Sequence, residues 1–259
     1  MSKKLIAEAT LPLFYKNPVL LRFEEHGAAR LAPQKGYGFA AETIAAPLCA
    51  SEFSTALRHY PIAFSLGKNP MPLALLGVEQ DVNLFVDNDG KWREGSYVPA
   101  YVRRYPFIVT EPEGGASQLL AIDAASDRFI MPSAECEGGE RIYDKAGLPT
   151  AITQDAMNFC RAFSVDYLAT VAFAQAIADA GLLVPNRAEI QLPGAARHVL
   201  DGFMTINEKA FRELPARTVM KWHSKGWLDL VALHFASQQN WQTLLDIYAL
   251  GLSHAKAVA

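Results

Sequence analysis

The sequence has too few cysteines for a disulfide framework. Its 259 residues contain only Cys49, Cys136 and Cys160, an odd number without any C-x-x-C spacing. Secreted scaffolds that depend on disulfides carry even sets of cysteines, and thiol redox motifs use C-x-x-C. The cysteine content therefore argues against both classes and favours a reducing compartment.

The chain also lacks an excess of charge of one sign and a long apolar run. Lys and Arg number 24 and Asp and Glu 27, so the net charge is −3 and no basic patch indicates a nucleic-acid partner. The longest apolar stretch, residues 168–184, is broken by Gln175 and Asp179 and is shorter than the ~20 residues that span a bilayer. Near the start, Glu8 interrupts the apolar run too early for a signal peptide. We therefore expect a soluble, cytoplasmic protein with no transmembrane segment.

The usual motifs of metal, cofactor and nucleophile sites are missing as well. The six histidines include no H-x-H, H-E-x-x-H or H-x-[DE] pattern, and neither G-x-S-x-G nor G-x-x-x-x-G-K-[ST] occurs. Residues 36–41 fit a loose dinucleotide-loop pattern, but they follow no buried strand and Pro47 cuts short any helix after them. Asp87 and Asp89 resemble part of a calcium loop whose other acidic positions are not filled. We predict no cofactor and no metal, and we assign no catalytic residue.

The first 150 residues have the pattern of short strands separated by proline and glycine. A tight-turn signal at Asp87–Gly90 follows three strand candidates, Ile62–Ser65, Leu73–Val78 and Val82–Val86. The turn should join the third candidate to a strand that runs into residues 96–110. Further along, Leu119–Asp123 is expected to form a hairpin with Arg128–Met131.

From about Pro149 the pattern becomes helical. Thr153 can cap a long helix from Gln154 to about Ala180, which Gly181 ends. Its predicted inner stripe consists of Met157, Cys160, Ser164, Leu168, Val171 and Gln175. A strand at Val199–Ile206 and helices at residues 219–225, 227–237 and 241–250 complete the chain.

Strands followed by helices predict an α+β fold. We expect a largely antiparallel β-sheet in the N-terminal half, packed against the long helix and a C-terminal helical bundle. Residues 1–150 would form a mainly-β subdomain and residues 151–259 a mainly-helical one. The two are expected to share one core, because the long helix must cover sheet surface to bury its apolar stripe.

The segment Ser96–Thr110, with the sequence SYVPAYVRRYPFIVT, is the most informative stretch of the chain. Read as a strand, it presents aromatic residues and an arginine on one face, Tyr97, Tyr101, Arg103, Tyr105 and Phe107. The other face carries aliphatic residues together with Arg104. Guanidinium groups beside tyrosines suit the recognition of carboxylates, phosphates or peptide backbones. Two interpretations stay open: a recognition surface, or core tyrosines whose neighbouring arginines pair with the acids at Glu135–Glu140.

Several blocks of the sequence together resemble the SapC family, which is distinct from the peptide-importer permease of the same name. They are residues 60–64 (YPIAF), 83–92 (NLFVDNDGKW), 97–107 (YVPAYVRRYPF), 139–144 (GERIYD), 202–207 (GFMTIN) and 233–237 (LHFAS). The resemblance covers almost the whole chain, and the aromatic block is its most specific part. It implies an accessory protein of a bacterial surface-layer or outer-membrane uptake system, and it implies no particular chemistry.

Our leading hypothesis is a cytoplasmic accessory protein that binds a peptide or protein partner. The predicted partner-binding residues are Tyr97, Tyr101, Arg103, Arg104 and Tyr105. One alternative is an enzyme that acts on a peptide or small molecule with a site built from residues distant in sequence. Another is a structural homo-oligomer.

Overall fold

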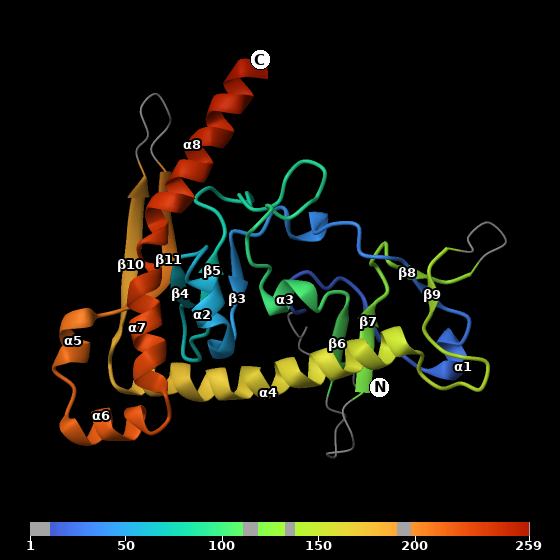
Figure 1. Ribbon diagram of the computed structural model, residues 1–259, viewed down its shortest axis with the longest axis horizontal. Coiled ribbons are helices and arrows are strands. Elements are labelled where there is room, and N and C mark those ends of the chain that lie inside the picture. The colour runs from blue at the N-terminus through green and yellow to red at the C-terminus, as the bar shows by residue number, and fades with distance from the viewer. Residues whose placement is uncertain (1–10, 111–118, 133–137, 191–197, 259) are drawn as a thin grey trace, which may run out of the picture. The chain divides into compact units, whose positions relative to one another are not determined.

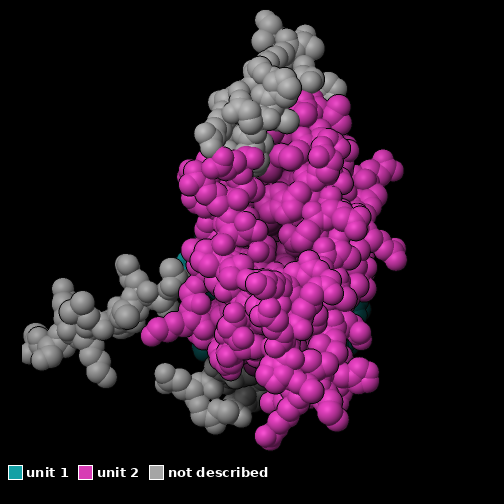
Figure 2. Space-filling view, turned by 90° about the vertical axis from the view of Figure 1, so that its left-hand side faces the viewer, with its two compact units in different colours: residues 1–34, 104–161 teal, residues 35–103, 162–259 magenta. Residues whose placement is uncertain are grey.

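The structure is a computed structural model that describes residues 11–110, 119–132, 138–190 and 198–258. It confirms the α+β fold class, with antiparallel sheets and a long helix. The chain divides into two compact units, each made of two separate segments (Figure 2). Unit 1 comprises residues 1–34 and 104–161, and unit 2 comprises residues 35–103 and 162–259. The subdomain boundary near residue 150 and the shared core stay predictions.

Unit 1 contains two small antiparallel sheets (Figure 1). In the first, β7 (Leu119–Asp123) lies between β1 (Pro18–Leu20) and β6 (Phe107–Thr110). The register sets Pro18 opposite Asp123 and Phe107 opposite Ile122. The central strand is the most buried of the three, since only Leu119 among its five residues is exposed.

The second sheet of unit 1 has β2 (Arg30–Leu31) between β8 (Phe129–Ile130) and β9 (Glu140–Arg141). The short helix α1 (Phe23–His26) precedes β2. A core cluster unites residues from both sheets with one residue of the long helix: Ala29, Leu31, Phe107, Leu120, Ile122, Ile142, Tyr143 and Cys160. Burial of this apolar surface is the main favourable term in the stability of unit 1.

Unit 2 is built on a five-stranded antiparallel sheet. In spatial order its strands are β10 (Leu183–Ile190), β11 (His198–Ile206), β4 (Ile62–Ser65), β5 (Pro72–Leu75) and β3 (Ala45–Pro47). The helices and 3₁₀ turns of this unit are η1 (Gly38–Ala40), η2 (Ala50–Glu52), α2 (Phe53–Ala56), α3 (Ala100–Arg103), α5 (Glu208–Arg212), α6 (Ala216–His223), α7 (Trp227–Ser237) and α8 (Asn240–Val258). Asn207 caps α5 with its side chain, as the sequence predicts.

Helix α7 packs against β4 and β11 of the sheet (Figure 1), and buried polar groups fix it there. The Ser237 hydroxyl accepts a hydrogen bond of 3.0 Å from the backbone N–H of Ile62 in β4. His234 Nε2 accepts one of 3.2 Å from the N–H of Ile206 in β11. Burial lowers the pKa of His234 to about 4, so this histidine is neutral and acts as an acceptor inside the unit.

The long helix α4 (Ala151–Asp179) begins in unit 1 and continues in unit 2. It starts three residues before the predicted Gln154, because Thr153 donates its hydroxyl to the Ile142 carbonyl at 2.7 Å instead of capping the helix. The predicted inner stripe is wrong at Leu168, which is 66% exposed. The buried residues of α4 are instead Thr153, Cys160, Phe163, Thr170, Phe173, Ala174 and Ile177.

The segment Ser96–Thr110 is not one strand. Pro99 starts a turn whose carbonyl accepts the N–H groups of Val102 and Arg103, and residues 100–103 form α3. A strand begins only after Pro106, at Phe107. Proline lacks an N–H donor and suits the first turn of a helix, so two prolines within this stretch prevent a continuous ladder.

Two other predictions on strands are corrected, and one strand was missed. Val82–Val86 is not a strand, and only Val86 makes an isolated bridge, to Trp92 across the predicted turn. Leu119–Asp123 forms no hairpin with the region after Arg128, because β7 pairs with β1 and β6 whereas β8 pairs with β2. Strand β10 was not predicted.

Candidate binding site around Glu52 and Arg103

Glu52 lies at the centre of a hydrogen-bonded cluster in unit 2. It belongs to the turn η2, where its Oε2 accepts the backbone N–H of Cys49 at 2.7 Å in a capping box. The residue is 7% exposed. The local sequence therefore directs a carboxylate inward at the start of a short helical segment.

The other oxygen of Glu52 holds a distant part of the chain. Its Oε1 accepts the Tyr97 hydroxyl at 2.9 Å and the N–H of Ala100 at 2.7 Å. Burial raises the pKa of Glu52, and the hydrogen bonds from Ala100, Cys49 and Tyr97 and the charge of Arg103 only partly offset this effect. Glu52 thus fixes the residues that lead into α3.

Arg103 extends the cluster to the surface. Its Nη2 donates to the Tyr97 hydroxyl at 3.0 Å, and its Nε donates to the Val98 carbonyl at 3.0 Å. The guanidinium carbon lies 5.5 Å from the centre of the Tyr97 ring. The side chain is exposed, so Glu52, Tyr97 and Arg103 form a chain from the interior of unit 2 to solvent.

Tyr97 has a hydroxyl between a carboxylate and a guanidinium. Its burial, together with the neighbouring Glu52, raises the pKa of Tyr97 to about 12, although Arg103 acts in the opposite direction. Tyr97 therefore keeps its proton at neutral pH. It donates this proton to Glu52 and accepts from Arg103, which orients all three groups.

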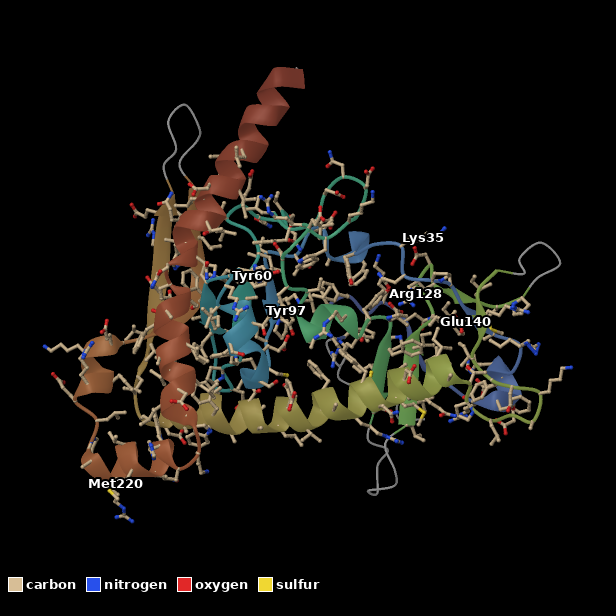
Figure 3. The ribbon with its side chains drawn as sticks, viewed as in Figure 1. Lys35, Tyr60, Tyr97, Arg128, Glu140 and Met220 are labelled. Carbon is tan, nitrogen blue, oxygen red and sulfur yellow. The ribbon has the colours of Figure 1, made fainter. Side chains whose placement is uncertain are left out.

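Aromatic side chains continue the site beside Tyr97 (Figure 3). The hydroxyl of the fully buried Tyr60 donates to the Tyr97 carbonyl, and Trp92 Nε1 donates to the Tyr60 hydroxyl at 3.2 Å. The Trp92 ring stacks on the Phe85 ring, with 6.3 Å between the ring centroids. It packs edge-to-face against the Tyr37 ring, with 5.6 Å between the centroids. Tyr37, Trp92 and Tyr97 are partly exposed, and of these three rings Tyr97 lies against the arginine.

The predicted tight turn holds this aromatic surface in place. Asp87 Oδ1 accepts the N–H groups of Asp89 and Lys91 at 3.0 and 2.8 Å, and these two hydrogen bonds close the turn. Gly90 has φ +75°, and its carbonyl accepts the Tyr37 N–H. A Cβ at Gly36 would lie 2.5 Å from that carbonyl, so glycine permits the close approach of the two backbones.

The structure brings together two of the five residues predicted for partner binding. Tyr97 and Arg103 are in contact in unit 2. Tyr101 also belongs to unit 2, but it is buried and packs against Phe163 at 6.1 Å. It therefore has the core role that the sequence left open for the tyrosines.

The other two predicted residues lie in unit 1. Tyr105 is buried, and its hydroxyl donates to Asp123 Oδ2 at 3.0 Å. The guanidinium carbon of Arg104 lies 5.7 Å from the centre of the Tyr15 ring. The alternative pairing with the acids at Glu135–Glu140 falls largely outside the described residues.

Sequence reasoning missed Glu52, Tyr60 and Trp92. Glu52 carried only the signal of an acid in the first turn of a helix, which is common at surfaces. Tyr60 and Trp92 stood in the blocks that carry the family resemblance, but no spacing linked them to Tyr97. Their contacts join positions 32 to 45 residues apart.

The described residues contain no group of three or more His, Cys, Asp or Glu side chains that could hold a metal ion. Cys49 and Cys160 are buried, and burial raises the pKa of the Cys160 thiol to about 11, which suppresses its thiolate form. Within the same described parts, no helix is long and apolar enough to cross a membrane.

The fold and the site define an α+β protein with a buried carboxylate that orients a surface arginine among aromatic rings. The model of the SapC family matches residues 21–244, which is most of the chain. The chain therefore belongs to the SapC family. A search of curated proteins and a search of solved structures gave no match.

Proposed function

We propose that this SapC-family chain is an accessory protein that binds a peptide or protein partner through the Arg103 site. The observation that carries the proposal is the chain from Glu52 through Tyr97 to the exposed Arg103. An arginine held by two hydrogen bonds has lost part of its side-chain freedom before binding, so less entropy is lost when a partner binds. The role in a surface-layer or outer-membrane uptake system rests on the family resemblance alone, and the cytoplasmic location rests on the cysteine content and the interrupted apolar runs of the sequence.

The chemistry of the site suits a peptide segment with a carboxylate or exposed backbone carbonyls. A guanidinium binds carboxylates through forked hydrogen bonds, and tyrosine and tryptophan are enriched where binding energy concentrates. Tyr97 supplies such a ring next to Arg103, and Trp92 is linked to Tyr97 through the Tyr60 hydroxyl. The partner would place an anionic or carbonyl group at Arg103 and apolar groups against the rings.

An enzyme is the alternative that one observation favours. Glu52 has a raised pKa and contacts Tyr97, and such pairs occur in acid–base catalysis. However, Glu52 accepts three hydrogen bonds from the unit itself, two of them from backbone N–H groups. These bonds give the carboxylate a structural role, so the binding function has the stronger support.

Affinity capture from the native organism with mass spectrometry tests the proposal. The wild-type chain should capture the same partner repeatedly, and Arg103→Ala should lose at least about 80% of it, since hot-spot arginines cost over ~1 kcal/mol when truncated. Arg58→Ala, which also removes an exposed arginine of unit 2, is the matched control and should bind normally. Equal capture by wild type and Arg103→Ala, with both folded, would exclude this site.

A further inference from the structure

The outward face of α4 is apolar, and nothing in the described part of the chain covers it. Val165 and Leu168 are 68% and 66% exposed. Ala162, Ala169 and Ala172 are exposed as well. The helix also has a buried face, so α4 is apolar on two sides, and a helix of this kind is normally buried on both.

The exposed residues follow a line along the helix. The exposed Ala162, Val165, Ala169 and Ala172, followed by the half-buried Ala176, are spaced by three and four residues in alternation, which is the spacing of a helix–helix seam, and Leu168 flanks this line. Small side chains at such positions let two helix backbones approach closely. The face therefore has the geometry of a contact with another helix.

The charges beside this line are complementary to those of a second copy. Arg161 and Asp179 are both exposed, and they are 18 residues apart, which is five turns at ~3.6 residues per turn. They therefore lie on the same flank, at opposite ends of the apolar line. The nearest other acid, Asp166, accepts the Ser51 hydroxyl at 2.9 Å and so points toward the body of unit 2.

An antiparallel pair of α4 helices from two copies would form two Arg161–Asp179 ion pairs. If a twofold axis passes near Ala169, Arg161 lies eight residues before it and Asp179 ten residues after it. Arg161 of one copy then faces Asp179 of the other with an offset of about 3 Å along the axis, which an arginine side chain can span. A parallel pair would instead keep Arg161 of one copy about 27 Å along the axis from Asp179 of the other, so the two charges could not pair.

We propose that the outward face of α4 is a homodimer interface, in which two copies pack antiparallel about a twofold axis near Ala169. Val165 and Leu168 supply the apolar contacts, and two Arg161–Asp179 pairs fix the direction. The proposal does not depend on a partner at Arg103, because the dimer can be measured with the purified chain alone.

The first test is the mass of the purified chain by light scattering over a range of concentrations. We expect a dimer for wild type and a monomer for Val165→Asp and for Leu168→Asp, both with an unchanged circular dichroism spectrum. Leu148→Asp is the matched control, since it places the same charge at another exposed leucine of the chain and should leave the dimer intact. A monomeric wild type, or a dimer that survives Val165→Asp, would overturn the proposal.

The second test addresses the direction of the pair. Arg161→Asp and Asp179→Arg should each raise the dimer dissociation constant at least about tenfold, because each sets like charges opposite one another. The double variant R161D/D179R should restore the wild-type value. Failure of this rescue would exclude the antiparallel arrangement.

Cysteine cross-linking gives a third, independent readout. In a Cys136→Ser background, Ala162→Cys and Ala176→Cys should form few disulfides when each is oxidised alone. A mixture of the two should form the 162–176 cross-link, because the twofold axis near Ala169 sets these positions opposite each other. Efficient cross-linking of Ala162→Cys to itself would indicate a parallel contact and overturn the proposal.

Discussion

Two buried carboxylates that both accept several hydrogen bonds have pKa shifts of opposite direction. Burial raises the pKa of both Glu52 and Asp123. Glu52 accepts from two backbone N–H groups and one tyrosine, and its pKa stays raised. Asp123 accepts from Asn17, Lys16 and Ala125 backbone N–H groups and from Tyr105, and these four bonds bring its pKa below the usual value.

Replacing Glu52 by Gln should reduce the free energy of unfolding by about 1–3 kcal/mol. The amide NH₂ of glutamine would face the N–H and O–H groups that donate to the Glu52 oxygens, and two donors cannot form a hydrogen bond with each other. The folded state binds the Glu52 proton more tightly than the unfolded chain does, for which the pKa is 4.5. The stabilisation by Glu52 is therefore fully present below pH 4.5 and falls as the pH rises through the raised folded pKa. Urea unfolding from about pH 4 to pH 8 should show the difference between wild type and Glu52→Gln shrinking with pH.

The control for this experiment is Glu42→Gln, an exposed glutamate of the same unit. Its stability difference from wild type should be below about 0.5 kcal/mol at every pH. A difference for Glu52→Gln that stays constant over the whole range would show that the carboxyl has the same pKa in the folded and unfolded states.

Asp123 should show the opposite pH dependence. Its folded pKa lies below the 3.8 of the unfolded chain, so its contribution is fully present above pH 3.8 and is lost as the pH falls through the folded pKa. Asp123→Asn should cost about 2–3 kcal/mol at neutral pH and less in acid, as measured by thermal unfolding. The exposed Asp127 gives the control variant Asp127→Asn. If wild type and Asp123→Asn lose the same stability as the pH falls through the acid range, Asp123 does not have a lowered pKa in the folded state.

At the scale of elements, the sequence was sufficient where one local signal decides the structure. The strand Ile62–Ser65 and the helix Trp227–Ser237 have the bounds that were predicted. The first is a short apolar run after a proline, and the second follows Gly226, whose φ of +69° suits a glycine before a helix. Neither needs information from a distant part of the chain.

Prediction failed where tertiary contacts override local pattern. Strand β10 contains Pro185 and a register shift after Asn186, which hide its alternation. It is an edge strand of its sheet, the position where proline is tolerated. The prediction of the site was incomplete for the same reason. The contact of Glu52 with Tyr97 joins residues 45 positions apart, and no local spacing in the sequence indicates it.

The two apolar faces of α4 explain why its inner stripe was placed wrongly. Periodicity shows that a helix has an apolar face, but it does not say which of two such faces meets the core. Phe173→Ala should cost about 3–5 kcal/mol because Phe173 is fully buried. Leu168→Ala should cost less than about 0.5 kcal/mol in dilute protein because Leu168 is exposed. Urea unfolding of both variants measures these losses of stability. Equal losses would show that Leu168 packs in the core, as the predicted inner stripe has it.

At the scale of the whole molecule, the chain builds each of its two compact units from two separate segments. Composition changes near residue 150, and that change suggested a boundary there. Unit 1 takes residues from both sides of this point, and so does unit 2, and the subdomain boundary stays a prediction. Helix α4 contributes its first eleven residues, 151–161, to unit 1 and the rest to unit 2.

This arrangement predicts that a fragment ending at residue 150 does not fold. Unit 1 would lose Cys160, a member of its core cluster, and unit 2 would lose β10, β11 and α7. The fragment should show no cooperative thermal transition, whereas the full chain should show a single one, because melting of either unit removes the support of half of α4. Calorimetry of both proteins is the measurement. Two separated transitions of the full chain would show that the two units unfold independently, and a cooperative transition of the fragment would show that residues 1–150 fold alone; either result would contradict this prediction.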